Sequence, residues 1–387
     1  MNPMSNTNGK IPASSNCIDY DVHGLVGVRL LEASAGDAAA VAKQLGPLQK
    51  QLQRTPDIVI RFVEHLPTPN LRLLGLDRCG YNDDGFYILR SSKKSAKVKI
   101  AFEQIGKQCQ IVCESGVRSV PLLMAIVNLT AMQRDCVPLH ASAFLYNGRG
   151  ILVTGWAKGG KTEALLSFAK HGARYIGDEW ILLSGDGEKM YGIPENIRLW
   201  DWHLNNLPHL RQQLKRETRL LFKSIHTLDR VQTKVPLHYL REAMPALKRQ
   251  LNVTLKPQTI FGLKCGPFVA KPEKIFLLMS HAEASTTVTP TDALGLARQM
   301  ISSNRFELLP LMEHYLAFTF AFPDLKNEFL ENIHERQFEI LSRAFAGKEA
   351  YTVRHPYPFS FDELFERMQP YCEARDAEPT ARMKATV

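Results

Sequence analysis

The sequence predicts an α/β protein built around a phosphate-binding loop, and three observations support this fold class. Residues 155–162 read Gly-Trp-Ala-Lys-Gly-Gly-Lys-Thr and match the pattern G-x-x-x-x-G-K-[ST]. Before them, residues 150–154 are apolar and rich in β-branched side chains, which is typical of a buried strand. After them, residues 163–170 carry apolar side chains at helical spacing. Strand, glycine loop and helix is the order that the motif requires.

The loop predicts a nucleotide-phosphate site. Glycines let backbone N–H groups curl around phosphate oxygens, and the helix N-terminus adds its positive end. We expect the Lys161 ammonium to reach the β- and γ-phosphates and the Thr162 hydroxyl to ligate Mg²⁺. The alternative is a chance match within a turn. The residues expected to bind nucleotide in this loop are Gly155, Lys158, Gly159, Gly160, Lys161 and Thr162.

A pair of acidic residues follows the loop closely. Residues 173–176 read as a short strand that runs into Asp178 and Glu179. Two carboxylates at a strand end suit metal binding and proton acceptance, and the sequence does not say which residue does which. About one helix and one turn separate the pair from Thr162, whereas in most P-loop enzymes the metal-binding aspartate comes much later. This compact order is more specific than either motif alone.

On these residues the chain resembles the HPr kinase/phosphorylase family, whose core is shared with ATP-dependent phosphoenolpyruvate carboxykinase. Two positions depart from the family pattern. The loop reads Trp-Ala-Lys where Ser-Gly-type residues are usual, and the acidic pair is Asp-Glu rather than Asp-Asp. The resemblance covers roughly residues 138–200 and does not identify the phosphate acceptor. The matching stretches are 138–142 (Pro-Leu-His-Ala-Ser), 150–154, 155–162, 164–166, 171–173 and 177–179.

The resemblance implies further site residues and a domain organisation. It places His140 close to the phosphates and the acidic pair, where a satisfied core histidine is the alternative. It makes Arg198 a candidate phosphate ligand, and it implies ATP and Mg²⁺ as cofactors and a homo-oligomer. The resulting catalytic set is Asp178, Glu179, His140 and Lys161. We expect an HPr-kinase-like P-loop domain over residues 136–345, of the HPr kinase/phosphoenolpyruvate carboxykinase type.

The chain before this domain predicts a tail and an α+β region. Residues 1–22 are rich in Asn, Ser, Gly and Pro, so we expect a disordered tail there, followed by the α+β region over 23–135. Asp37 is the expected N-cap of a helix over 37–48. No catalytic constellation is visible in this region. The other elements expected are strands at 25–31, 57–63, 97–102 and 110–114, a turn at 82–85, and a buried helix at 121–133.

After the acidic pair, the chain predicts more strands and then mostly helices. If residues 193–202 are extended, Trp200 and Trp202 share a face, where they pack either beside the ligand or in the core. We expect residues 346–387 to form a C-terminal helix and a tail. The strands expected are a hairpin strand at 139–146 and others at 180–183, 190–191 and 274–279, and the helices are one from Thr289 through Met300 and others at 308–320, 329–345 and 361–368.

Residues 205–256 form a basic insertion within the P-loop domain. They contain eleven Lys and Arg residues against three acidic ones, and their apolar pattern is helical in pieces broken by prolines. Three interpretations remain open: a mobile lid over the nucleotide, a docking surface for an acidic partner, and a solvated helical insertion.

Composition sets outer limits on function. The 387 residues carry a formal charge of +9, are 45 % hydrophobic and 22 % charged, and match a soluble globular chain. Seven cysteines without a C-x-x-C pair indicate reduced buried thiols, with Cys109 and Cys113 on one face of a strand. No signal peptide or membrane-spanning stretch is visible, so we expect a cytoplasmic protein without a membrane partner.

The leading hypothesis is an ATP-dependent kinase that transfers the γ-phosphate of Mg-ATP to a protein serine or a small-molecule hydroxyl. The alternative is a nucleotide-binding regulatory module with little turnover. Nucleic acid is not an expected partner, because the basic insertion lacks interleaved aromatics and a recognised fold signature. The shared core also admits a carboxykinase-like reaction, but the motif order favours the kinase.

Overall fold

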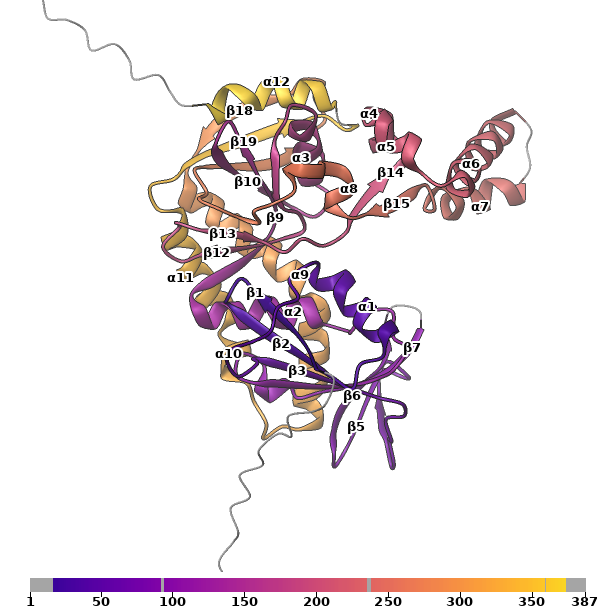
Figure 1. Cartoon of the computed structure of the whole chain (residues 1–387), viewed down its shortest axis with the longest axis vertical. Coiled ribbons are helices and arrows are strands. Elements are labelled where there is room, and N and C mark those ends of the chain that lie inside the picture. Colours follow the sequence, from indigo (N-terminus) through magenta and orange to yellow (C-terminus); the bar gives the residue numbers. More distant parts are fainter. Residues whose placement is uncertain (1–16, 92–93, 235–237, 359, 374–387) are drawn as a thin grey trace, which may run out of the picture. The chain divides into compact units, whose positions relative to one another are not determined.

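The computed structural model of the chain is a mixed α/β structure that describes residues 17–91, 94–234, 238–358 and 360–373 (Figure 1). It divides into two compact units. Unit 1 contains the described residues up to Arg134 together with 308–332, and unit 2 contains 135–307 and the described residues from 333 onward. The expected P-loop domain of 136–345 is therefore wrong for residues 308–332, which pack into unit 1.

Unit 1 is built on an eight-stranded sheet. Its order is β1-β2-β3-β8-β7-β6-β5-β4, in which β2, β3 and β8 are parallel and all other neighbours are antiparallel. The strands are β1 (Cys17–Val22), β2 (Val26–Leu31), β3 (Ile58–Val63), β4 (Arg72–Leu74), β5 (Cys79–Asn82), β6 (Gly85–Ser91), β7 (Lys94–Ile100) and β8 (Cys109–Glu114). The strands predicted before residue 135 are confirmed, and Cys109 and Cys113 both lie on the buried face of β8.

The predicted tail over residues 1–22 is wrong at its end. Residues 17–22 form β1, which pairs with β2 along its whole length and buries Tyr20 and Val22. The polar residues of this strand have partners: Asp19 binds Arg29 at 2.7 Å and accepts the Leu52 N–H at 3.0 Å. Residues 1–16 of the predicted tail lie outside the described residues.

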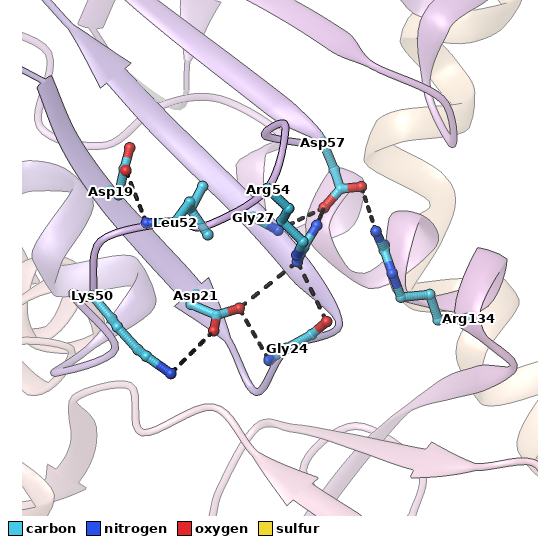
Figure 2. Close-up of polar contacts among 9 residues, drawn as sticks. All are labelled: Asp19, Asp21, Gly24, Gly27, Lys50, Leu52, Arg54, Asp57 and Arg134. Atoms are coloured by element: carbon cyan, nitrogen blue, oxygen red, sulfur yellow. Dashed lines mark hydrogen bonds and ion pairs between the residues drawn. The ribbon is translucent and has the colours of Figure 1, made fainter.

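Polar contacts fix the segment between β2 and β3 (Figure 2). The Asp57 carboxylate accepts hydrogen bonds from the Gly27 N–H at 2.7 Å, from Arg54 at 2.5 Å and from Arg134 at 2.8 Å. Burial raises the pKa of Asp57, but these hydrogen bonds outweigh burial and hold the pKa below its usual value. The Asp57 carboxylate therefore connects the start of β2 to Arg134, the last residue of a short 3₁₀ turn over Met132–Arg134.

The helices of unit 1 are α1 (Ala35–Leu45), α2 (Leu123–Ala131), α10 (Glu328–Glu331) and the second half of α9 (Ala293–Ala321), with short 3₁₀ turns η1 (Phe102–Gln104) and η2 (Met132–Arg134). The prediction that Asp37 is the N-cap of α1 is wrong. Ser34 is the N-cap, and Asp37 is the third helical residue, which closes a capping box with the Ser34 backbone.

Unit 2 is built on a nine-stranded sheet of order β16-β13-β12-β9-β10-β17-β19-β18, with β11 pairing β9 beside β12. In its centre β10, β17 and β19 are parallel. The strands are β9 (Cys136–Tyr146), β10 (Arg149–Gly155), β11 (Arg174–Gly177), β12 (Trp180–Ser184), β13 (Met190–Gly192), β16 (Val269–Ala270), β17 (Lys274–Ser280), β18 (Thr287–Thr291) and β19 (Glu349–His355).

The core of unit 2 lies between this sheet and two helices, α3 (Lys161–Lys170) and α12 (Phe361–Cys372). Phe144, Phe168 and Phe276 are fully buried in it, as the apolar strands and the helical spacing of 163–170 predict. Helix α11 (Ile333–Phe345) packs on β9 and β12. The α/β class is thus observed, with the loop of residues 156–160 between β10 and α3.

Two expectations about the C-terminal third are wrong. Residues 287–291 form the edge strand β18 rather than the start of a helix, and α9 begins at Ala293 after Asp292 accepts the Gly295 N–H. Residues 349–355 form β19 within the segment 346–387, which was expected to hold only a helix and a tail. The tail residues 374–387 lie outside the described residues.

The basic insertion of residues 205–256 and the residues on either side of it form a small ribbon and several short helices. The ribbon pairs β14 (Ile197–Trp200) with β15 (Asn252–Leu255), and Figure 1 shows helices α6 and α7 side by side at its far end. Phe222 of α6 joins the core cluster of unit 2. The helices are α4 (Asp201–Asn206), α5 (Pro208–Gln213), α6 (Arg216–Lys234), α7 (His238–Lys248) and α8 (Pro257–Phe261), with the 3₁₀ turn η3 (Gly262–Lys264).

Within the described ranges, no helix has the length and apolar character needed to cross a membrane.

Candidate functional site

The glycine loop lies at the carboxyl end of β10, at the N-terminus of α3 and beside the parallel strand β17. Two of its glycines are required by close contacts. A Cβ on Gly155 would lie 2.6 Å from the Leu278 carbonyl oxygen, and one on Gly159 would lie 2.9 Å from the Trp156 carbonyl oxygen. Gly160, with φ of 99°, precedes the first residue of α3 in the left-handed region. The loop thus has the tight backbone curvature that a phosphate cradle needs.

Lys161 is buried under this loop. Its ammonium donates to the Trp156 carbonyl at 2.8 Å and to the Gly155 carbonyl at 3.3 Å, and the residue is 6 % exposed. Burial lowers the pKa of Lys161, while the carboxylates Glu179 and Asp178 act in the opposite direction. The cation therefore lies at the base of the loop with acidic groups around it.

The acidic pair lies at the point along β9 where the neighbouring strand changes from β11 to β12. β11 ends at Gly177 and β12 begins at Trp180, and both strands pair with β9. In the gap, Glu179 adopts a left-handed φ of 67° and its carbonyl accepts the Ala141 N–H at 3.2 Å. The break in pairing turns the two carboxylates out of the sheet toward the glycine loop.

Asp178 contacts the loop directly. Its carboxylate accepts the Thr162 hydroxyl at 3.0 Å, and the residue is only 3 % exposed. Burial and the neighbouring Glu179 raise the pKa of Asp178 to about 7. A buried carboxylate next to a hydroxyl is a hard-oxygen donor pair that a divalent cation would stabilise.

His140 joins the two motifs from strand β9. Its Nε2 forms an ion pair with Glu179 at 3.2 Å, and its Nδ1 forms one with Glu307 of α9 at 2.7 Å. Burial lowers the pKa of His140, but these two carboxylates outweigh it and raise the pKa. In return, the hydrogen bond to His140 lowers the pKa of Glu179. Sequence reasoning missed Glu307, because it lies 167 positions after His140 in a helix without a motif.

A cavity of about 540 Å³ opens over these groups. Arg198 lines it as an exposed residue of β14, and Lys158 lines it with a left-handed φ of 63°. The structure thus brings Lys158, Gly159, Gly160, Lys161 and Thr162 to one cavity with His140, Glu179 and Arg198. Asp178 reaches the same group through Thr162, and Gly155 lies behind the loop rather than in the cavity lining.

The predicted arrangement of Trp200 and Trp202 on one strand face is wrong. Trp200 ends β14, but Trp202 is in helix α4, so they do not share the face of one extended strand. Both nevertheless line the cavity, together with His203 and Tyr357. Helix α4 begins here because Asp201 follows the ribbon and the His203 Nδ1 accepts the Trp200 N–H at 3.1 Å.

The residues fit the groups that the motif implies. The loop glycines provide a cradle, and the buried Lys161 lies beneath it as the positive charge. The Thr162 hydroxyl and the Asp178 carboxylate are the hard oxygen ligands that would hold Mg²⁺. Within the described part of the chain, no group of three or more His, Cys, Asp or Glu side chains forms a ready-made metal site.

No protein-family model matches the chain, and no curated protein matches it significantly.

Proposed function

We propose that the chain is an ATP-dependent kinase with a P-loop core of the HPr kinase/phosphoenolpyruvate carboxykinase type. It transfers the γ-phosphate of Mg-ATP to a hydroxyl of a protein or a small molecule. The contact of 3.0 Å between Thr162 and Asp178 carries this proposal, because it joins two sequence motifs that were recognised separately. The buried Lys161 and the cavity over the loop support it.

In the proposed reaction the chain contributes mainly positions and charges. Loop N–H groups and Lys161 bind the phosphate oxygens. Thr162 and Asp178 would hold Mg²⁺, which would neutralise the charge of the phosphates during transfer. The acceptor oxygen forms a bond to the γ-phosphorus, the bond from this phosphorus to the β–γ bridging oxygen breaks, and ADP leaves.

Glu179 is the better placed of the two carboxylates to take the acceptor proton. Its side chain is 52 % exposed and lines the cavity, whereas Asp178 is buried against Thr162. His140 holds Glu179 in place and makes it a weak base. A weak base is sufficient, because phosphoryl transfer proceeds through a loose transition state in which the acceptor proton is lost late.

The test is transfer of label from γ-labelled Mg-ATP to total protein and metabolite extract. We expect one labelled acceptor with the unmodified protein and at least about a hundredfold slower labelling with Lys161→Ala and Asp178→Asn, because each removes charge stabilisation of the transition state. Matched controls are Lys189→Ala and Asp324→Asn, at exposed positions outside the cavity lining, which should label normally.

The other outcomes are equally informative. Tight ATP binding without transfer to any acceptor would replace the kinase by a nucleotide-binding regulatory module. Absence of nucleotide binding would overturn the assignment of the loop.

A further inference from the structure

The cavity over the loop has two chemically different sides. Consecutive residues of a helix point about 100° apart, so Thr162 and Glu163 face different directions at the start of α3. Thr162 faces Asp178, and Glu163 faces His203 of α4, with an Oε1 to Nε2 distance of 3.0 Å. One side therefore carries Asp178, Glu179 and His140, and the other carries the Glu163–His203 pair beside the ring of Trp202.

His203 holds Glu163 in one orientation. Its ring is almost fully buried, and its Nδ1 accepts the Trp200 N–H at 3.1 Å. Nε2 therefore carries the hydrogen and donates it to the Glu163 Oε1. The Oε2 of Glu163 accepts no hydrogen bond from the residues that the structure describes, while Glu163 lines the cavity. The Glu163 Oε2 therefore has a fixed position and can still accept a hydrogen bond. A hydroxyl or an N–H group of a ligand is a suitable donor.

The loop sets the direction in which a nucleotide lies. In this motif the lysine reaches the β- and γ-phosphates, and the backbone N–H groups hold the α- and β-phosphates. Thr162 and Asp178 would hold Mg²⁺, which would neutralise charge near the transferred phosphate, so we expect the γ-phosphate end on their side of the cavity. We therefore expect the α-phosphate and the nucleoside on the side of Glu163, which lines the same cavity.

We propose that Glu163 binds the ribose hydroxyls of the nucleotide, and that His203 is the residue that positions Glu163. A vicinal diol offers two O–H donors to one carboxylate, and a carboxylate is a recurrent partner of the ribose 2′-hydroxyl in nucleotide-binding proteins. Trp202, whose ring packs against His203, and Tyr357, which lines the same cavity, provide aromatic surface for the base. The site is therefore selective for ribonucleotides. This inference rests on the proposed nucleotide site.

The test is equilibrium binding of Mg²⁺ complexes of ATP, 2′-deoxy-ATP and inorganic tripolyphosphate to the full chain. We expect 2′-deoxy-ATP to bind about ten to a hundred times more weakly than ATP, because it loses a hydrogen bond to a charged group. In Glu163→Gln the two nucleotides should bind within about threefold of each other, because a neutral acceptor gives a weaker bond. Glu188→Gln, at an exposed position outside the cavity lining, is the matched control and should keep the full ratio.

His203→Phe tests the positioning role. It keeps an aromatic ring but cannot donate to Glu163, so the ratio of the two nucleotide affinities should fall while tripolyphosphate affinity stays unchanged. A loss of tripolyphosphate affinity as well would mean that His203 only supports the fold.

The outcomes separate this inference from the proposed function. Equal affinity of the unmodified protein for ATP and 2′-deoxy-ATP would overturn the ribose site and leave the kinase proposal standing, and this result needs no variant. A ratio that persists in Glu163→Gln would also overturn it. Failure of ATP and tripolyphosphate alike to bind would overturn the phosphate site itself.

Discussion

Glu195, in the segment between β13 and β14, shows how closely the site packs acidic groups. Its Oε1 is buried and has no hydrogen-bond partner among the described residues. Burial, followed by the charges of Glu179 and Asp178, raises the pKa of Glu195 from 4.5 to about 8. At neutral pH this carboxyl is therefore protonated in the folded chain and ionised in the unfolded chain.

This difference predicts a pH dependence of stability. Between pH 4.5 and 8 unfolding releases the Glu195 proton, so the free energy of unfolding falls as pH rises, and above pH 8 the loss is complete. Glu195→Gln cannot ionise, so at pH 9 it should be more stable than the unmodified protein by roughly 2 to 5 kcal/mol, the upper figure being the whole shift from 4.5 to about 8 converted at about 1.4 kcal/mol per pKa unit. At pH 4.5 or below the two should be nearly equal. Chemical denaturation without nucleotide at both pH values measures the difference.

The exposed substitution Glu335→Gln is the control and should change stability equally little at both pH values. A stability difference for Glu195→Gln that does not depend on pH would show that Glu195 is ionised in the folded chain.

At the same scale, the sequence predicted some site residues and missed others for a physical reason. The motif spacing placed Lys161, Thr162 and the acidic pair near one another, because only one helix and one short strand separate them. Glu307 and His203 could not be found this way. They reach the site through the packing of α9 and through the fold of the ribbon and α4, and neither carries a local pattern.

At the scale of single elements, the loop depends on a close approach between β10 and β17. Gly155→Ala should push the loop away from β17, because its Cβ would lie 2.6 Å from a backbone carbonyl that cannot rotate away, and its φ of 154° is also unfavourable. We expect a loss of about 2 kcal/mol in stability and at least tenfold weaker Mg-ATP binding. Thermal unfolding and calorimetric titration measure the two effects.

Gly148→Ala is the matched control. Gly148 has a positive φ of 78° in the turn between β9 and β10, but its Cβ would meet no atom within 4 Å. It should cost about 1 kcal/mol and leave Mg-ATP binding unchanged. If Gly155→Ala bound Mg-ATP as tightly as Gly148→Ala, the close approach would not shape the proposed phosphate site.

Some helices and strands are determined by their local sequence pattern, and others by partners far along the chain. The strands and helices with a strong periodic pattern, such as β3, β17 and α3, were predicted from the sequence. The errors fall where partners far along the chain decide the conformation. Strand β1 forms because it pairs with β2, and β18 forms because it pairs antiparallel with β19. Trp202 lies in a helix because His203 caps α4 through the Trp200 N–H.

At the scale of the whole molecule, unit 1 is assembled from two separate stretches of chain. Asn327 donates to the carbonyls of Phe102 and Ile105 at 2.8 and 2.9 Å, and Phe318 stacks on Phe102 with centroids 5.5 Å apart. These contacts bury Phe102 completely. The sequence predicted separate helices at 289–300 and 308–320, whereas α9 is continuous, and no local pattern in the second stretch indicates that it belongs to unit 1.

A fragment of residues 17–134 should therefore fail to fold alone. It exposes the Phe102 cluster and loses the partners of the Phe102 and Ile105 carbonyls. Dispersion of amide signals in NMR spectra measures folding, and we expect dispersed signals only after a peptide of residues 308–332 is added. A peptide of the same composition in scrambled order is the control. Native-like dispersion of the fragment by itself would contradict the division of unit 1.

The interleaving of the units also limits how such a protein can change over generations. The chain crosses between units after residues 134, 307 and 332. A recombination event that replaced the coding region for residues 1–134 would leave the resident 308–332 segment facing a foreign sheet, with Asn327 and Phe318 mismatched. Exchange of unit 1 therefore requires two coordinated genetic replacements, so the two units should be inherited together even where their surfaces diverge.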